Sequence, residues 1–273
     1  MENCIRSHLS RMVLLSLLVA TPGRAADLFV DNVAGDDRFD GRSVTASDSL
    51  SGPCRTIAKA LRVAQKGDRI VLTDTGQPYR ECITLQAGRH SGLAKEPFEI
   101  VGNGATLEGA APVPATAWQH VAGDIYRFPP PRKSYQLLFL AGRPAERVVP
   151  DPQSADLPEL KPMQWCLFER QVYFRTEPGR GPTSYALSYT SHTVGITLYE
   201  VRNVVVRDLT IQGFQLDGVN AHDSVFDASL IGLTCRGNAR SGVSIGGASQ
   251  VRLDGCLLGN NGTAQLRTLS LIH

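Results

Sequence analysis

The sequence lacks any marked excess of charge. It contains 28 basic and 26 acidic residues, and without residues 1–25, which carry three Arg and one Glu, both counts become 25. A neutral chain offers no overall electrostatic attraction to nucleic acid or to an anionic membrane surface. We therefore expect no nucleic-acid partner for this protein.

The apolar run at the start is too short to span a bilayer. Two arginines precede this run, MVLLSLLVA at 12–20, and small residues follow it up to Ala25. A basic start, a short apolar centre and small residues at a cut site are typical of a secretory signal peptide. We predict a signal peptide over residues 1–25, cleavage near Ala25, a secreted or periplasmic product and no membrane span in the mature chain. An anchored N-terminus is the alternative.

The cysteines follow no metal-binding or redox pattern. Cys4 falls within the predicted signal peptide, and the remaining five include no CxxC pair. Export permits disulfides, so a Cys54–Cys82 bond is one possibility. The interpretation we favour is that the cysteines occupy apolar positions as small buried hydrophobes.

A single short helix is predicted near the start of the mature chain. In residues 56–66, Ile57, Ala60 and Leu61 share one face, and Thr56 can cap the start. The runs that follow are short, β-like and separated by turn residues: IVL at 70–72, CITLQ at 82–86, FEIVG at 98–102 and ATLEG at 105–109.

From residue 194 the sequence repeats with a period of 23 or 24. LTIQGFQLDGV at 209–219 is followed by LTCRGNARSGV at 233–243, and Gly-Ile or Gly-Val recurs at 195, 218 and 242. Aliphatic positions recur with the same period: Val204, Val206, Leu209 and Ile211 correspond to Ala228, Leu230, Leu233 and Cys235, and then to Val251, Leu253, Cys256 and Leu258. Such a period indicates one structural unit per repeat, stacked on the next.

Each repeat contains three short strands and no helix, which predicts a coil of three parallel sheets around one core. Alternation sends the aliphatic side chains inward, and each coil adds about 4.8 Å of length. Gly213, Gly237 and Asn260 share a turn column that suits left-handed backbone. Asn238 and Asn261 can hydrogen-bond between coils, which explains the sequon at 261–263 better than glycosylation does. A leucine-rich repeat is the rival, but its consensus is missing.

Residues 111–193 break this rhythm with Pro-rich joints and are predicted to form an inserted β-rich subdomain. Its best strand candidates are QLLFLAG at 136–142 and QVYFRTE at 171–177. Four aromatic residues lie in the segment: Trp118, Tyr126, Trp165 and Tyr173. They can form a sugar-stacking surface with Trp118 and Trp165 as substrate-binding residues, or they can fill the core of a small β unit.

Together these segments resemble the secreted bacterial right-handed parallel β-helix proteins of the pectate-lyase-like superfamily. The resemblance is carried by LFVDNVAGDDRFDGRS at 28–43, GPCRTIAKALRVAQKGDRIVL at 52–72, PYRECITL at 78–85, FEIVGNGATLEG at 98–109, WCLFERQVYFRTEPG at 165–179 and the repeats after 194. It implies an all-β fold, a right-handed parallel β-helix (three-sheet solenoid) with an N-terminal capping helix. The organisation expected is cap and first coils at 26–110, the insertion at 111–193 and repeats at 194–262.

The resemblance also implies that the sheet with the Gly-Ile and Gly-Val column faces a polysaccharide. On this sheet or its rim lie the candidate catalytic residues Asp217, His222, Asp223 and Arg240 and the candidate substrate-binding residues Asn220 and Ser244. A polysaccharide lyase removes a proton beside a uronic carboxylate and neutralises the charge that develops, with a base and with Ca²⁺ or another cation. Asp217 and Asp223 are candidate Ca²⁺ ligands. The alternative is that these are ordinary polar residues of a solvated sheet, and no lysine base follows Lys161.

Lyase-like β-elimination on an acidic polysaccharide is thus the predicted reaction, and two alternatives stay open. QLDGVN at 215–220 resembles the NTDG-type motif of polygalacturonases, but Leu216 departs from it, and Arg-Ser-Gly at 240–242 stands where Gly-His-Gly is expected. A paired-carboxylate hydrolase therefore has little support. The other alternative is a non-catalytic extracellular or cell-envelope glycan-binding scaffold. We expect a monomer.

Four aspartates lie close together in DNVAGDDRFDG at 31–41. They can bind Ca²⁺, but the spacing and the closing Glu of an EF-hand are missing. We favour a polar Gly/Asp turn that leads into the predicted helix.

After Gly262 the repeat pattern stops in TAQLRTLSLIH, with no recognisable cap over the last coil. We therefore expect residues 263–273 to be irregular and the chain to be a truncated product that lacks part of its active groove.

Overall fold

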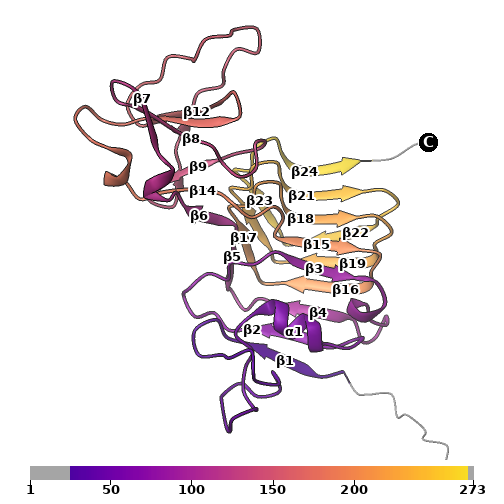
Figure 1. Ribbon diagram of the computed structural model, residues 1–273. Coiled ribbons are helices and arrows are strands. Elements are labelled where there is room, and N and C mark those ends of the chain that lie inside the picture. The colour runs from indigo at the N-terminus through magenta and orange to yellow at the C-terminus, as the bar shows by residue number, and fades with distance from the viewer. Residues whose placement is uncertain (1–24, 270–273) are drawn as a thin grey trace, which may run out of the picture.

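Three parallel sheets make up the larger part of the computed structural model, which describes residues 25–269 (Figure 1). The first contains, in spatial order, β1 (Asp27–Val30), β2 (Arg69–Leu72), β4 (Phe98–Val101), β16 (Arg202–Arg207), β19 (Phe226–Ile231) and β22 (Val251–Asp254). The second contains β3 (Ile83–Gln86), β15 (Ile196–Tyr199), β18 (Asp217–His222), β21 (Ser241–Gly246) and β24 (Ala264–Leu269). The third contains β5 (Thr106–Glu108), β17 (Thr210–Gln212), β20 (Thr234–Arg236) and β23 (Leu257–Gly259). With the helix α1 (Ile57–Val63) they form what we call the coil stack.

The predicted aliphatic columns are confirmed as the core of the coil stack. Ile83, Ile196, Val219 and Val243 lie opposite one another in β3, β15, β18 and β21, and each is at most 1 % exposed. Side chains from all three sheets join one buried cluster. Burial of each branched side chain contributes about 1.5 to 3 kcal/mol, so the aligned columns hold the three sheets together.

The coil stack continues in register across the long insertion. β4 pairs with β16, so that Phe98 lies opposite Val204 although more than a hundred residues separate them. β5 pairs with β17 in the same way, with Leu107 opposite Ile211. Residues 110–190 therefore leave the stack after one coil and return to build the next.

The remaining strands form two smaller sheets, which we call the inserted unit. One contains β6 (Ala110–Pro112), β14 (Leu187–Thr190), β9 (Leu138–Leu140) and β10 (Arg143–Pro144). The other contains β7 (Gln119–Ala122), β8 (Ile125–Phe128), β13 (Gln171–Arg175), β12 (Gln164–Phe168) and β11 (Glu146–Arg147). Their apolar side chains form clusters of their own, and the unit projects from one side of the stack (Figure 1).

The predicted helix is present but shorter than residues 56–66. Thr56 caps it, because its Oγ1 accepts a hydrogen bond from the Lys59 amide at 3.1 Å. Ile57, Ala60 and Leu61 are buried in the core of the coil stack. The helix ends at Val63 since the Asp68 carboxylate binds the Gln65 amide at 2.8 Å and turns the chain toward β2. Three 3₁₀ turns complete the described elements: η1 (Ala87–His90), η2 (Ala115–Ala117) and η3 (Pro182–Ser184).

The aspartates of residues 31–41 bind backbone amides, as a turn requires. Asp37 accepts hydrogen bonds from the amides of Arg55 and Thr56 at 3.0 and 2.9 Å. Asp31 accepts from the amides of Val33 and Ala34. The Asp37 bonds fasten the segment to the start of α1, and the Asp31 bonds hold the turn itself.

The predicted turn columns are also present. Gly213, Gly237 and Asn260 all have positive φ, at 75°, 61° and 55°. One coil apart, the Asn238 Nδ2 donates to the Asn261 Oδ1 at 3.0 Å, and both side chains are buried. The turns thus carry a hydrogen-bonded asparagine ladder alongside the sheets.

Residues 264–269 correct the expectation of an irregular end. They form β24, which pairs in parallel with β21 and places Leu266 opposite Val243. The backbone of β24 therefore continues the coil stack, although the sequence of residues 264–269 hardly matches the repeat pattern. Residues 1–24, and so nearly all of the predicted signal peptide, lie outside the described residues, as do 270–273.

The five cysteines among the described residues are free thiols, so Cys54 and Cys82 are not bonded to each other. Cys54, Cys166 and Cys235 are buried, and burial raises the pKa of Cys235 to about 12 and that of Cys166 to about 11. These three remain protonated and pack as small hydrophobes. Within residues 25–269, no helix has both the length and the apolar character to cross a membrane.

Candidate functional site

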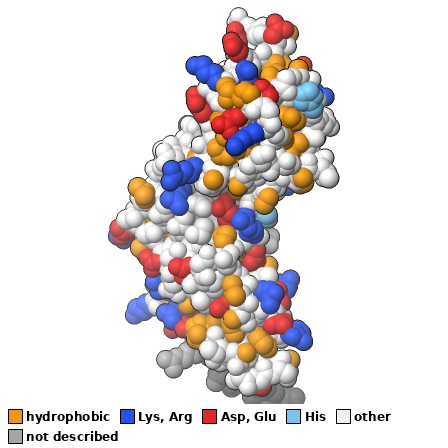
Figure 2. Space-filling view, turned by 90° about the vertical axis from the view of Figure 1, so that its left-hand side faces the viewer, with side chains coloured by type: hydrophobic (Ala, Val, Ile, Leu, Met, Phe, Trp, Pro, Cys, Tyr) orange, Lys and Arg blue, Asp and Glu red, His pale blue; other side chains and the backbone are white. Residues whose placement is uncertain are grey.

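A cleft lies where the inserted unit meets the third sheet of the coil stack. We call it the junction cleft; its volume is about 450 Å³. The coil stack contributes Glu108, Gln212, Gly213, Arg236, Gly237 and Asn260, and the inserted unit contributes Ala110, Phe139, Ala141, Gly142, Arg143, Pro144 and Ser188. Figure 2 shows the side of the molecule on which the two parts meet, with charged side chains of both signs around the junction.

The wall formed by the coil stack carries a ladder of polar side chains. Glu108, Gln212 and Arg236 occupy the same position in β5, β17 and β20, one coil apart. The Gln212 Nε2 donates to the Glu108 Oε2 at 2.8 Å, and the Arg236 Nε donates to the Gln212 Oε1 at 2.9 Å. Each side chain therefore holds the next in place, with a carboxylate at one end and a guanidinium at the other.

Gly213 makes room for the carboxylate end of this ladder. The Glu108 Oε1 accepts a hydrogen bond from the Ala110 amide at 2.9 Å. A Cβ at position 213 would lie 2.1 Å from that oxygen, and the φ of 75° is one that favours glycine. At the other end Gly237 also has a positive φ, of 61°, whereas an added Cβ there would make only an ordinary contact of 3.4 Å with the ring of Phe139.

Two arginines face the cleft from opposite walls. Arg143 belongs to β10 and Arg236 to β20, and both are exposed. Neither belongs to any ion pair found among residues 25–269. Guanidinium groups bind carboxylates bidentately when geometry allows, so these walls are suited to an anionic ligand with many hydroxyl groups.

Asp217 and Arg240, two of the predicted catalytic residues, are brought together outside this cleft. The Arg240 Nε donates to the Asp217 Oδ1 at 3.0 Å, and a terminal nitrogen of the guanidinium donates to Oδ2. The Ser241 Oγ also donates to Oδ1, at 2.5 Å. The carboxylate holds the pKa of Arg240 above its ordinary value. Asp217 is 0 % exposed, so its carboxylate cannot contact a polysaccharide.

The other predicted residues on this sheet lie apart from that pair. His222 is at the far end of β18, where its ring is 5.9 Å from that of Tyr199, and Asp223 follows it with a positive φ. Asn220 and Ser244 lie opposite each other in β18 and β21, but Ser244 is only 2 % exposed. The structure therefore does not assemble one catalytic group from these residues.

The predicted Ca²⁺ ligands do not fit a shared ion. Asp217 and Asp223 lie six residues apart along an extended strand, which separates them by about 20 Å, and Asp217 is already bound by Arg240 and Ser241. Within residues 25–269, no three His, Cys, Asp or Glu side chains are placed to hold a metal ion.

Trp165 is a core residue and has no exposed surface for sugar stacking, whereas Trp118 is half-buried. Trp165 is 0 % exposed, and its Nε1 donates to the Ala145 carbonyl at 3.1 Å. Trp118 packs edge-on against Phe128, with ring centroids 4.9 Å apart. Trp165 belongs to the main buried cluster of the inserted unit, and Trp118 packs against that cluster while also lining a hollow of about 200 Å³.

The residues that line the junction cleft were not among the predicted site residues. A signal for them exists in the sequence: Gln212 and Arg236 are polar residues 24 apart, each directly after the inward-facing Ile211 or Cys235. The repeat pattern cannot predict the opposite wall of the cleft, because that wall belongs to the inserted unit, whose sequence does not repeat.

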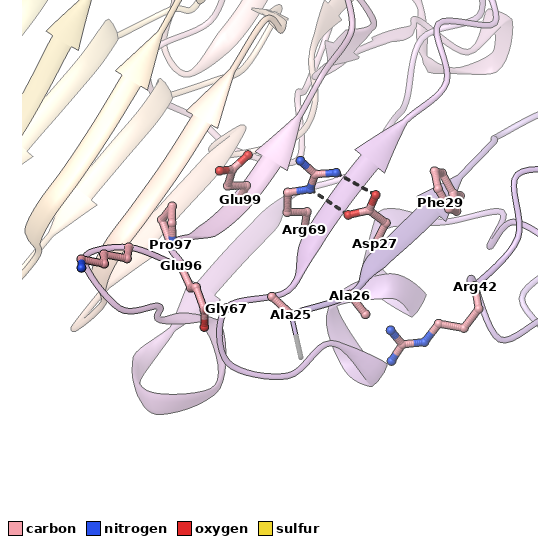
Figure 3. A pocket seen from close by; sticks show the side chains of 11 residues that line it. Ala25, Ala26, Asp27, Phe29, Arg42, Gly67, Arg69, Glu96, Pro97 and Glu99 are labelled. Carbon is pink, nitrogen blue, oxygen red and sulfur yellow. Dashed lines mark hydrogen bonds and ion pairs between the residues drawn. The ribbon is translucent and has the colours of Figure 1, made fainter. Parts of the chain in front are cut away.

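A second hollow, of about 640 Å³, lies over the first strands of the coil stack (Figure 3). Three of its charged side chains, Asp27, Arg69 and Glu99, belong to ion pairs, whereas Arg42, Lys95 and Glu96 belong to none of those found within residues 25–269. The Arg69 guanidinium binds both oxygens of Asp27 at 2.7 Å, and Glu99 pairs with Arg207 at 3.6 Å. The junction cleft differs from this hollow in that both the coil stack and the inserted unit contribute to its walls.

Comparison with known proteins indicates a shared fold. No protein-family model and no curated protein matches the sequence. Among solved structures, a glycoside hydrolase matches with a TM-score of 0.53 and 11% identity over 85% of this chain and 65% of that chain. XylC in complex with xylose gives 0.49 and 12% over 89% and 60%, and the GH136 lacto-N-biosidase from Eubacterium ramulus gives 0.40 and 13% over 90% and 34%. The chain thus spans less than two thirds of the length of each, and at 11% identity only the fold is shared.

Proposed function

We propose that this protein is a secreted carbohydrate-binding protein that holds an acidic polysaccharide in the junction cleft. Its scaffold would be a right-handed parallel β-helix of the pectate-lyase-like type, with α1 covering the first coil. The all-β arrangement, the register of the three parallel sheets and the burial of α1 against their common core support this scaffold. The name of the glycoside hydrolase with the similar fold supports the carbohydrate ligand.

The two unpaired arginines on opposite walls carry the proposal. A uronic acid has one carboxylate and several hydroxyls per sugar. Arg143 and Arg236 can bind the carboxylate, and Glu108, Gln212 and Ser188 can bind hydroxyls. A neutral glycan would leave both cations without an anionic partner.

Binding has stronger support than any particular reaction. β-Elimination needs a base and a cation, and the cleft has Glu108 as the one carboxylate among its lining residues, together with two arginines. Both oxygens of this carboxylate already accept hydrogen bonds, one from Gln212 and one from the Ala110 amide. Inverting or retaining hydrolysis needs a second carboxylate, so among reactions β-elimination remains the better candidate.

A binding measurement tests the proposal. Isothermal titration calorimetry with oligogalacturonate should show binding to the wild-type protein, and a neutral xylo-oligosaccharide of equal length should bind more weakly. Replacing both arginines, Arg143→Gln with Arg236→Gln, removes charge-assisted hydrogen bonds worth about 1.5 to 3 kcal/mol each. We expect a loss of affinity of at least about tenfold.

The matched control is Arg252→Gln, on the outer face of β22, where the guanidinium is exposed and paired with Asp254 at 3.0 Å. This variant should bind like the wild type. Equal affinity for the acidic and the neutral oligosaccharide, or no effect of the double replacement, would contradict the proposed function.

Product analysis separates the catalytic alternatives. Incubation with polygalacturonate should give ultraviolet absorbance from unsaturated sugars if the protein is a lyase, and Glu108→Gln should abolish it. New reducing ends without that absorbance indicate a hydrolase. Binding without either product indicates a non-catalytic scaffold. Repeating the assay with Ca²⁺ and with a chelator tests the predicted metal requirement.

A further inference from the structure

The inserted unit is fastened to the coil stack by a short loop, residues 132–136, that runs directly into β9. The Gln215 side chain, 2 % exposed, donates from its Nε2 to the Ser134 carbonyl. Within the loop, the Gln136 Nε2 donates to the Arg132 carbonyl at 2.8 Å, and the Gln136 Oε1 accepts from the Thr190 Oγ1 at 2.9 Å. Buried polar groups of both parts thus meet at this loop.

Tyr135, in the middle of the loop, has a backbone conformation that needs support. Its φ is 52°, a region that costs a residue with a Cβ some free energy. The Arg240 guanidinium lies 5.9 Å from the centre of the Tyr135 ring, within the range of a cation–π contact. The loop is therefore held on one side by Gln215 and on the other by Arg240.

Arg240 is itself held by Asp217. The two side chains come from neighbouring coils, since Asp217 lies opposite Ser241 in β18 and β21. The bidentate contact and the Ser241 hydroxyl satisfy a carboxylate that has no access to water. A buried charge of this kind is tolerated only while it is paired. The guanidinium consequently has one orientation, in which its outer face meets Tyr135.

The loop leads within a few residues to one wall of the junction cleft. Leu137 binds Thr190 through both its amide and its carbonyl, and the cleft-lining residues Phe139, Ala141 and Arg143 follow. We propose that Asp217 and Arg240 are positioning residues, which hold the 132–136 loop against the coil stack and so fix the wall that carries Arg143. The cleft's role as a glycan site rests on the proposed function above; the fastening of the loop does not.

Hydrogen exchange measured by mass spectrometry tests the fastening directly. In Arg240→Lys the charge remains but the bidentate contact and the planar group over Tyr135 are lost. Amides of residues 134–141 should then exchange at least about tenfold faster, while those of β15 keep their wild-type rates. Tyr135→Ala removes the contact from the other side and leaves the buried pair intact, so it should give the same local effect even if Arg240→Lys folds poorly. Arg207→Lys, a surface arginine paired with Glu99 and Asp208, is the matched control and should change nothing.

The same variants are then titrated with oligogalacturonate. We expect Arg240→Lys and Tyr135→Ala to bind about tenfold more weakly although Arg143 and Arg236 are unchanged. Wild-type exchange rates at 134–141 in both variants would overturn the inference, and so would faster exchange with unaltered affinity. If the wild type binds no glycan, the proposed function fails, and the exchange rates alone decide whether the loop is held as described.

Discussion

Asn238 is a single side chain that joins three coils. Its Oδ1 accepts from the Phe214 amide at 3.1 Å, and its Nδ2 donates to the Ile211 carbonyl at 3.2 Å and to the Asn261 Oδ1 at 3.0 Å. It is 0 % exposed, so water cannot replace these bonds. Asn238 therefore links neighbouring coils by hydrogen bonds at the turn, as the backbone hydrogen bonds link them along the strands.

We predict that Asn238→Ala lowers the free energy of unfolding by about 3 kcal/mol, because it leaves buried backbone groups without partners. Guanidinium unfolding followed by circular dichroism measures the change. Asn220→Ala, at a half-buried position on the outer face of β18, should cost less than about 1 kcal/mol. Equal costs for the two variants would contradict the role given to the ladder.

At the scale of single elements, α1 is tied to the coil stack by one histidine. The His90 Nδ1 accepts from the Gln86 amide at 3.0 Å, and Nε2 lies 3.0 Å from the Leu61 carbonyl, to which it donates. This arrangement needs the neutral ring, since a proton on Nδ1 would face the Gln86 N–H. Burial, the main cause, lowers the pKa of His90 below its ordinary value of 6.5.

The lowered pKa of His90 determines how the stability of the protein changes with pH. Between the lowered folded pKa and 6.5 the unfolded chain binds a proton that the folded chain does not, so stability rises with pH. The contribution of His90 is present in full above about pH 6.5 and is lost as the pH falls toward the folded pKa. We predict that the wild type loses more stability than His90→Gln between pH 7.5 and 5.5 in thermal unfolding. Parallel losses in the two proteins would exclude this role.

The same elements show what the sequence could and could not predict. Periodicity identified α1, the aliphatic columns and the turn column, because each depends on residues close in the chain or one repeat apart. It did not identify Glu81, whose carboxylate accepts from the amides of Ile57 and Ala58 at 2.9 Å each and so fastens the start of α1. Contacts such as these depend on which coil the helix packs against, and no local pattern encodes that.

The site was less predictable than the fold for a related reason. A polar residue on a strand of the coil stack was taken to face solvent, yet Asp217 and Ser244 are buried. Asp217 lies two residues before the inward-facing Val219 in β18 and so points to the same side of the sheet. Likewise the sequence does not decide whether Trp165 stacks on a sugar or fills a core, because the core of the inserted unit cannot be recognised without a repeat. Arg236 could have been found from its column, but Arg143 could not.

At the scale of the whole molecule, the coil stack and the inserted unit have separate cores. Phe98, Leu107 and Leu230 belong to the cluster of the stack, whereas Trp165 and Phe174 belong to that of the inserted unit. The two tryptophans of the sequence, Trp118 and Trp165, both lie in the inserted unit. Tryptophan fluorescence therefore reports on one core and far-ultraviolet circular dichroism mainly on the other.

We predict that guanidinium unfolding followed by these two signals gives midpoints that differ, because cores that share few contacts unfold as separate cooperative units. Leu230→Ala, in the stack core, should destabilise by about 2 to 5 kcal/mol and move the dichroism midpoint alone. Coincident midpoints that shift together would show a single cooperative unit instead.

The offset of 24 residues from β17 to β20 and from β18 to β21 has a consequence for how the length of this molecule can change. Ile211 lies opposite Cys235 and Val219 opposite Val243, so excising the 24 residues 213–236 would join Gln212 to Gly237 with every surviving side chain still facing its former side. The length of the coil stack can thus change by a whole coil, which adds or removes one strand in each of the three sheets.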